Sequence, residues 1–187
     1  MDKKVKTVNI ILQWIVFVLL IVLDQITKVL VRKYLPAGNN RYDLIPGVFC
    51  LEHIENDGSV WGILSGRISF LLIVSVILFA VLLYVYIKLP KTHHYLVLLW
   101  IDIFMMAGAI GNSIDRVVFG HVTDFFYFEL INFAIFNVAD IYITCAAFIT
   151  IILILTKYRD NDFAFLMLKG KKTEEPSSDG ESSNNDK

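Results

Sequence analysis

The sequence predicts an all-α polytopic membrane protein with four transmembrane helices, a small extracytoplasmic β-sheet and an interfacial helix. Of the 187 residues, 56% are hydrophobic, and the mean hydropathy is +0.62. A soluble domain needs more polar surface than this, whereas apolar stretches of ~20 residues are typical of transmembrane helices. The net charge of −1 argues against a nucleic-acid partner, because such partners select strongly basic surfaces.

Four segments are long and apolar enough to cross a hydrocarbon core that is ~30 Å thick. They cover residues 8–23, 69–89, 95–112 and 137–156. The first continues as helix through DQITKVLV, and Pro90 ends the second. The N-terminal MDKKVK and the apolar run behind it imitate a signal peptide, but no small-x-small cleavage site follows. We therefore expect an uncleaved first span.

The positions of lysine and arginine predict the orientation, because these residues concentrate on the cytoplasmic side. Basic residues flank the N-terminus, the second connection and the C-terminal end of the last span: Lys3, Lys4, Lys6, Lys88, Lys91, Lys157 and Arg159. Both termini are thus expected in the cytoplasm, and residues 36–68 and 113–136 on the outer side. A basic stripe after the first span, formed by Lys28, Arg32 and Lys33, predicts an amphipathic helix lying along the interface.

The connection over residues 36–68 alternates apolar and polar positions in RYDLIPGVFCLEHIEN, which predicts short strands and a small sheet. Residues 1–170 are expected to form one membrane domain. Residues 171–187, which include TEEPSSDGESSNNDK, have almost no apolar side chains and are expected to be a disordered cytoplasmic tail. A monomer is expected, because no helix face is rich in small residues.

Polar side chains gather where the predicted spans meet the outer side. They occur in GNSIDRVVFGHVTDFF (111–126), in FNVAD (136–140), at the end of the first span and in the first outer connection: Asn112, Asp115, Arg116, Asp124, Asn137, Asp140, Asp24, Lys28 and Asn56. One aspartate near headgroup water is ordinary interfacial anchoring. Several that converge from three spans indicate a functional site, because ionisable groups are costly near lipid.

Two close aspartates are suited to peptide hydrolysis. Their like charges raise one pKa, so the pair shares a proton and supplies one base and one acid. The base takes a proton from water while the acid protonates the peptide carbonyl. This chemistry needs no metal and no cofactor. A metal held by His121, Asp124 and Asp140 is a less favoured alternative.

Two other classes of function remain open at this point. Asp124 and Asp140 are also candidates for the coupling carboxylates of a small proton-coupled transporter. A transporter requires a polar route across the membrane, and the spans offer little beyond Asp102, Gln13 and a few hydroxyl groups. A non-enzymatic scaffold leaves the polar band unexplained.

The four polar blocks resemble those of lipoprotein signal peptidase (signal peptidase II), a family of bacterial membrane aspartic peptidases. The resemblance rests on DQITK, NDGSVWG, GNSIDR with HVTDFF, and FNVAD, in this order. It implies a multi-pass protein of the bacterial cytoplasmic membrane with its active site at the extracytoplasmic face. The implied substrates are diacylglyceryl-modified prolipoproteins, cut on the amino side of the lipidated cysteine, and membrane lipid is the other implied partner.

Carried over by position, the resemblance implies a catalytic dyad of Asp124 and Asp140. It also implies substrate-binding or positioning roles for Asn56, Gly58, Asn112, Asp115, Arg116, Asn137, Asp24 and Lys28. The sequence departs from the family at Ser59, Val60 and Trp61, where the family usually has Ala-Ala-Phe, so the substrate groove is expected to differ in shape.

Asp102 is a second departure, within LLWIDIFMM in the third span. It lies ten residues before Asn112, hence ~15 Å deeper at 1.5 Å per residue, too far to join Asp124. Gln13 and Thr150 are expected at a similar depth. We therefore predict a buried interhelical hydrogen bond from Asp102.

Overall fold

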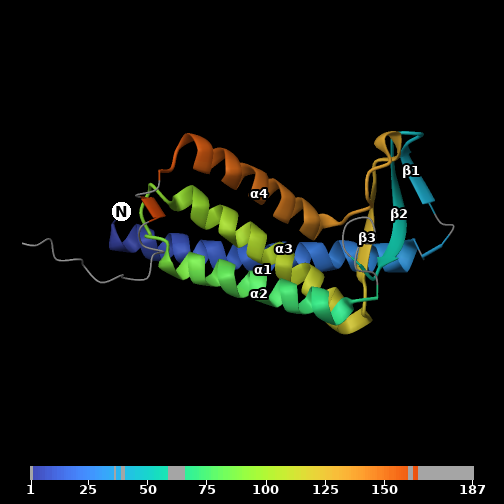
Figure 1. The fold of residues 1–187 in the computed structure, drawn as a ribbon, viewed down its shortest axis with the longest axis horizontal. Helices are drawn as coiled ribbons and strands as arrows, with labels where there is room; N and C mark the ends of the chain where they lie inside the picture. The colour runs from blue at the N-terminus through green and yellow to red at the C-terminus, as the bar shows by residue number, and fades with distance from the viewer. Residues whose placement is uncertain (1, 36, 39–40, 59–65, 160–161, 164–187) are drawn as a thin grey trace, which may run out of the picture.

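The computed structural model describes residues 2–35, 37–38, 41–58, 66–159 and 162–163. The elements are α1 (Lys3–Tyr34), β1 (Arg41–Ile45), β2 (Phe49–Asn56), α2 (Ile68–Lys88), α3 (Leu96–Phe119), β3 (Val122–Tyr127), η2 (Glu129–Ile131) and α4 (Val138–Thr156). Figure 1 shows the four α-helices side by side as an elongated bundle, with the strands gathered at the end away from the N-terminus. The predicted fold class of four spans and a small sheet is confirmed. The predicted tail and Ser59, Val60 and Trp61 lie outside the described residues.

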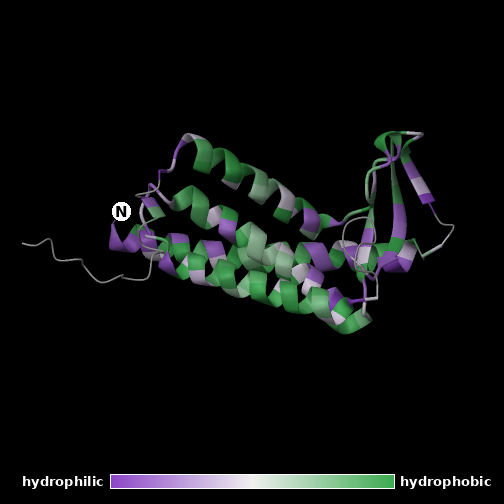
Figure 2. Ribbon diagram, viewed as in Figure 1, coloured by the Kyte–Doolittle hydropathy of each residue, from purple (hydrophilic) through white to green (hydrophobic). Residues whose placement is uncertain are grey.

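All four helices are long and apolar enough to cross a membrane. Along its most apolar stretch α3 is 67% buried, whereas the other three helices are each 11% buried. α3 is therefore the central helix, and the others turn most of their apolar side chains outward, where a bilayer solvates them. Figure 2 shows that most residues along the helices are hydrophobic and that hydrophilic residues concentrate toward the two ends of the bundle.

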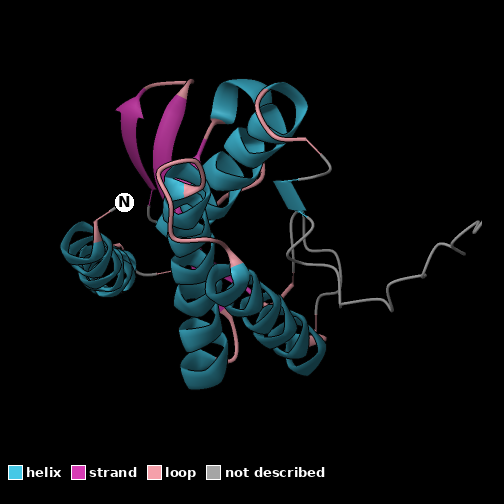
Figure 3. Ribbon diagram, turned by 90° about the vertical axis from the view of Figure 1, so that its left-hand side faces the viewer, coloured by secondary structure: helices cyan, strands magenta, loops and turns pink. Residues whose placement is uncertain are grey.

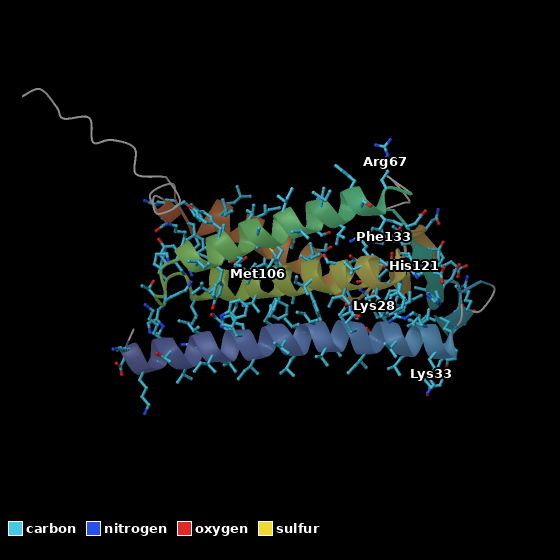
Figure 4. The ribbon with its side chains drawn as sticks, turned by 90° about the horizontal axis from the view of Figure 1, so that it is seen from below. Lys28, Lys33, Arg67, Met106, His121 and Phe133 are labelled. Atoms are coloured by element: carbon cyan, nitrogen blue, oxygen red, sulfur yellow. The ribbon has the colours of Figure 1, made fainter. Side chains whose placement is uncertain are left out.

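α1 differs from the expectation of a separate interfacial helix. It runs without a break over 32 residues, from Lys3 to Tyr34. Lys28, expected on an exposed basic stripe, has a fully buried side chain that points toward α3 (Figure 4). The spacing of the three basic residues correctly indicated helix, but Lys28 is turned inward by buried carboxylates, which compensate its charge.

The sheet is antiparallel with strand order β1-β2-β3. β1 and β2 come from the connection in which strands were expected, but β3 comes from residues 113–136, which were treated as a loop. Ile54 of β2 lies opposite Asp124 of β3, and Leu51 lies opposite Phe126. The sheet thus carries Asp124 on a strand. Figure 3, a view along the bundle from the end that carries the N-terminus, shows the strands beyond the helices.

α3 and α4 approach each other closely at Gly108. A Cβ placed on Gly108 would lie 2.6 Å from the backbone oxygen of Ala139 and 2.7 Å from Cγ1 of Ile143. Any side chain larger than hydrogen would therefore separate the two helices. Close backbone approach through a small residue is a usual mode of helix packing in membranes.

The predicted interhelical hydrogen bond of Asp102 is wrong. Asp102 is buried, but neither carboxyl oxygen has a hydrogen-bond partner among the described residues. Gln13 instead accepts from the hydroxyl of Tyr86 at 2.8 Å, and Thr150 donates to the carbonyl of Ala146 in its own helix. Similar depth did not produce hydrogen bonds to Asp102, because Thr150 is bonded within its own helix and Gln13 is bonded to Tyr86.

Candidate active site

Asp140 is fixed at the first turn of α4 by a reciprocal cap. Asn137, the N-cap residue, accepts from the backbone N–H of Asp140 at 3.1 Å. In return, the backbone N–H of Asn137 donates to Oδ2 of Asp140 at 3.0 Å. Such a capping box satisfies two otherwise unpaired donors of the helix end. The cap thus sets the orientation of the Asp140 carboxyl group.

Asp124 reaches the same place from the sheet. Its side chain is 3% exposed in the middle of β3. Oδ1 accepts from Nδ2 of Asn137 at 2.6 Å, and Oδ2 accepts from Nδ2 of Asn56 at 2.7 Å. Strand and helix therefore converge on one residue, Asn137, which contacts both aspartates.

Asn112 of α3 links Asp140 to Asn137. Its Nδ2 donates to Oδ1 of Asp140 at 2.8 Å, and its Oδ1 accepts from Nδ2 of Asn137 at 3.0 Å. Two asparagine side chains thus hold Asp124 and Asp140 in one hydrogen-bonded group. Each amide uses its nitrogen toward a carboxylate, so an amide flip would break contacts on both sides.

A buried ionic cluster supports this group from below. Lys28 donates to Oδ1 of Asn112 at 2.8 Å and lies 2.9 Å from Asp24 and 3.6 Å from Asp115. Asp24 accepts from the backbone N–H of Ala139 at 3.0 Å, at the start of α4. All three ionic side chains are fully buried. The cluster therefore joins α1, α3 and α4 immediately beneath the asparagines.

Asp115 connects the same cluster to β3. Its Oδ2 accepts from the backbone N–H of Thr123 at 2.9 Å, next to Asp124. Arg32 donates to the hydroxyl of Thr123 at 2.6 Å and lies 3.7 Å from Asp115. The position of β3, and with it Asp124, is thus tied to α1 and α3.

Asn56 and Gly58 form the edge of the site on the sheet side. The Oδ1 of Asn56 accepts from the backbone N–H of Gly58 at 2.9 Å, while its Nδ2 holds Asp124. Arg116 donates to the carbonyl of Gly58 at 3.5 Å. This contact is long, so the Arg116 guanidinium retains donors for another group.

The electrostatics of the site favour a protonated carboxyl group. Burial, and next the negative charge of Asp140, raise the pKa of Asp124 to about 7, against the opposing hydrogen bonds from Asn56 and Asn137. Both carboxyl groups bind Asn137, so they lie close enough for their charges to interact. Near neutral pH such a pair holds one proton between two carboxylates.

The structure brings together all ten residues that the sequence singled out. Two contributors were missed, Gln25 and Thr123. Gln25 donates to Asp24 and to the carbonyl of Gly111, both at 3.1 Å. Gln25 lies in the DQITK block and Thr123 lies next to Asp124. Their positions within these blocks could have identified them as residues of the site. His121, part of the alternative metal site, lies 3.8 Å from Glu55 and stacks on Phe119.

A family model described as signal peptidase (SPase) II matches residues 16–156. The chain belongs to the signal peptidase II family. It is therefore an enzyme, a peptidase of the aspartic type, and its four apolar helices make it a membrane-embedded one. A proton-coupled transporter is not favoured by this membership.

Individual relatives agree with the signal peptidase II assignment. Proteins named lipoprotein signal peptidase from Caldanaerobacter subterraneus subsp. tengcongensis and Enterococcus faecalis are 40% identical over 136 residues and 37% identical over 134 residues. These matches cover 72% and 70% of this chain and 90% and 80% of the relatives. A solved structure described as a bacterial membrane enzyme is 30% identical, with a TM-score of 0.69, and the match covers 86% of this chain and 94% of that one.

Proposed function

We propose that this protein removes the signal peptide from diacylglyceryl-modified prolipoproteins, cutting on the amino side of the lipidated cysteine. Asp124 and Asp140 act as the catalytic dyad. The observation that carries the proposal is the convergence of both carboxyl groups on Asn137 at the sheet end of an apolar bundle. The relatives named lipoprotein signal peptidase support the choice of substrate.

The chemistry follows from a dyad that holds one proton. The ionised carboxylate removes a proton from a water molecule, whose oxygen attacks the peptide carbonyl carbon. The protonated carboxyl group gives its proton to the carbonyl oxygen, so a neutral tetrahedral intermediate forms. The carboxyl group that is now protonated then gives its proton to the peptide nitrogen, while the other carboxylate takes a proton from a hydroxyl group of the intermediate. The C–N bond breaks, and the pair is again singly protonated.

Four neighbouring side chains keep this geometry. Asn112 and Asn137 orient the two carboxyl groups. Lys28 fixes Asn112, which in turn accepts a hydrogen bond from Asn137. Arg116 retains donors that suit a peptide carbonyl of the substrate. Because these donors are held in place before substrate binds, little reorganisation is needed at the moment of reaction.

The membrane environment fits a lipidated substrate. An apolar groove of ≈ 270 Å³ lies between α2 and α3 near the site and is lined by residues such as Leu72, Val76, Ile110 and Val117. It suits acyl chains, whose cysteine then lies at the level of the dyad. The basic residues near the termini support an orientation with the sheet end on the extracytoplasmic side of the cytoplasmic membrane.

The test uses purified protein in detergent with a diacylglyceryl-modified prolipoprotein. Asp124→Asn and Asp140→Asn are each expected to lower kcat by about 10³-fold, because each removes a proton-transfer group. Asp43→Asn, the same change on β1, is the matched control and is expected to retain activity. Mass spectrometry of the product should give a lipidated N-terminal cysteine. Full cleavage by either dyad variant would refute the proposal.

A further inference from the structure

A cavity of ≈ 200 Å³ lies in the half of the bundle opposite the sheet. Its walls come from α2, α3, α4 and Phe163. Asp102 and Thr150 are its polar lining residues in the part of the chain that the structure describes, and the rest of the wall is apolar. A cavity of this size accommodates one medium-sized side chain with apolar neighbours.

The carboxyl group of Asp102 faces this cavity with unused acceptors. Asp102 is 5% exposed, and within the described ranges neither oxygen has a hydrogen-bond partner and no basic group lies within 4.0 Å. The hydroxyl of Thr150 is already used by the carbonyl of Ala146. The nearby Lys91 is also engaged, since it donates to the carbonyl of Tyr86 and lies 4.1 Å from the centre of that ring. A buried carboxyl without a donor is costly, so a ligand that supplies one is stabilised here.

The cavity lies on the faces of α3 and α4 that carry Asn112 and Asp140. Met105, which lines it, is seven residues before Asn112 on α3, and Ile154 is fourteen residues after Asp140 on α4. Residues at intervals of seven lie on one face of a helix. A segment that leaves the active site along α3 and α4 therefore passes the cavity, where Asp102 is ~15 Å further in.

The proposed substrate carries such a segment. A signal peptide has a basic n-region followed by roughly 7–15 apolar residues, which span about 10–22 Å when helical. With the scissile bond at the dyad, the basic residue ahead of the apolar segment comes level with Asp102. We infer that Asp102 binds this lysine or arginine and so sets which signal peptides are accepted. The inference rests on the proposed function and adds a specificity-determining residue to it.

The test scans the position of one lysine in otherwise identical lipidated prolipoproteins. The lysine is moved in single steps from roughly 8 to roughly 20 residues ahead of the scissile bond. For the unaltered protein, KM is expected to reach a minimum with the lysine about 10–14 residues ahead. The minimum should be about tenfold below the KM of a lysine-free substrate, as for one charge-assisted hydrogen bond. Asp102→Asn is expected to flatten the profile while kcat is retained.

Two further variants separate a binding role from a structural one. Thr150→Val changes the same cavity without changing charge and is expected to keep the minimum. Asp102→Lys is expected to prefer a glutamate at the same register, which a purely structural effect cannot produce. A register-independent KM in the unaltered protein, or an unchanged minimum in Asp102→Asn, overturns the inference. Failure of the proposed function is distinct, because no lysine position would then give cleavage.

Discussion

Lys28 shows how one buried charge organises the site. Its ammonium is fully buried between Asp24, Asp115 and the side-chain oxygen of Asn112. Lys28→Met leaves Asp24 without its cation and Asp115 with only Arg32, at 3.7 Å. Removing one partner of a buried ion pair costs about 3–5 kcal/mol. We expect a loss of this size in thermal unfolding of the detergent-solubilised protein. Asp24→Asn/Lys28→Met should recover part of it, and equal stability of the single and double variants would contradict this account.

The pH dependence of cleavage tests the state of Asp124. Burial and the charge of Asp140 raise the pKa of Asp124 to about 7, so the dyad loses its shared proton as the pH rises through that value. We expect kcat/KM to fall above pH ~7, by about tenfold per pH unit at full ionisation. The hydrogen bond from Asn56 lowers this pKa, so Asn56→Ala should move the basic limb to higher pH. A limb that stays in place, or moves to lower pH, would count against the assignment.

The raised pKa of Asp124 also makes the stability of the folded protein depend on pH. The pKa of Asp124 is raised from 3.8 to about 7 on folding, so the folded protein binds more protons than the unfolded chain between these values. The contribution of Asp124 to stability is therefore fully present below pH ~4 and is lost as the pH rises through about 7.

The sequence predicted which side chains belong to the site, but it predicted few of the contacts that hold them in place. Asn137 and Asp140 stand three residues apart at the start of an apolar segment, a spacing that permits a capping box. The backbone N–H donors of Ala139 and Thr123 could not be predicted in this way, because every residue other than proline has a backbone N–H group. Asp102 was placed at the correct depth, but the hydrogen bond predicted for it is absent among the described residues. Depth follows from sequence position, whereas the direction of a side chain depends on packing.

At the scale of elements, β3 was the part that sequence reasoning missed. Its residues VTDFFY do not alternate between apolar and polar, since Val122 through Phe125 are all buried. Thr123 is bonded to Asp115 and Arg32 in the ionic cluster, and Asp124 is bonded to Asn137, so both polar residues are buried as well. A polar strand that is buried by a functional site therefore has no period-2 signal.

The contact of α3 with α4 makes a prediction about Gly108. Gly108→Ala places a methyl group 2.6 Å from the carbonyl oxygen of Ala139, so the helices must separate, and overpacking of this kind costs about 1–3 kcal/mol. We expect a lower unfolding temperature. Gly111→Ala is the informative comparison, because its methyl group would lie 2.5 Å from Oδ2 of Asp24 and should lower activity as well. Unchanged stability of Gly108→Ala would show that the two helices pack less closely than this.

For the whole molecule, one layer of polar residues lies at one end of an apolar bundle. Hydropathy alone identified the four helices, and the positions of the polar blocks identified the layer. The central place of α3 was not apparent from its apolar content. Its mean hydropathy of 1.7 is the lowest of the four helices, since a helix enclosed by protein carries the polar residues that lipid-facing helices exclude.

The orientation of this bundle decides on which side of the membrane cleavage takes place. Tyr42 on β1 is 62% exposed at the sheet end, and His93, between α2 and α3, is exposed at the opposite end. In a Cys50→Ala/Cys145→Ser background, we expect a membrane-impermeant maleimide to label Tyr42→Cys in intact cells. His93→Cys is expected to react only after permeabilisation, because the lysines near the termini predict a cytoplasmic location for that end. The reverse labelling pattern would put the dyad on the cytoplasmic side. The dyad would then face the basic n-region of a signal peptide and could not reach its cleavage site.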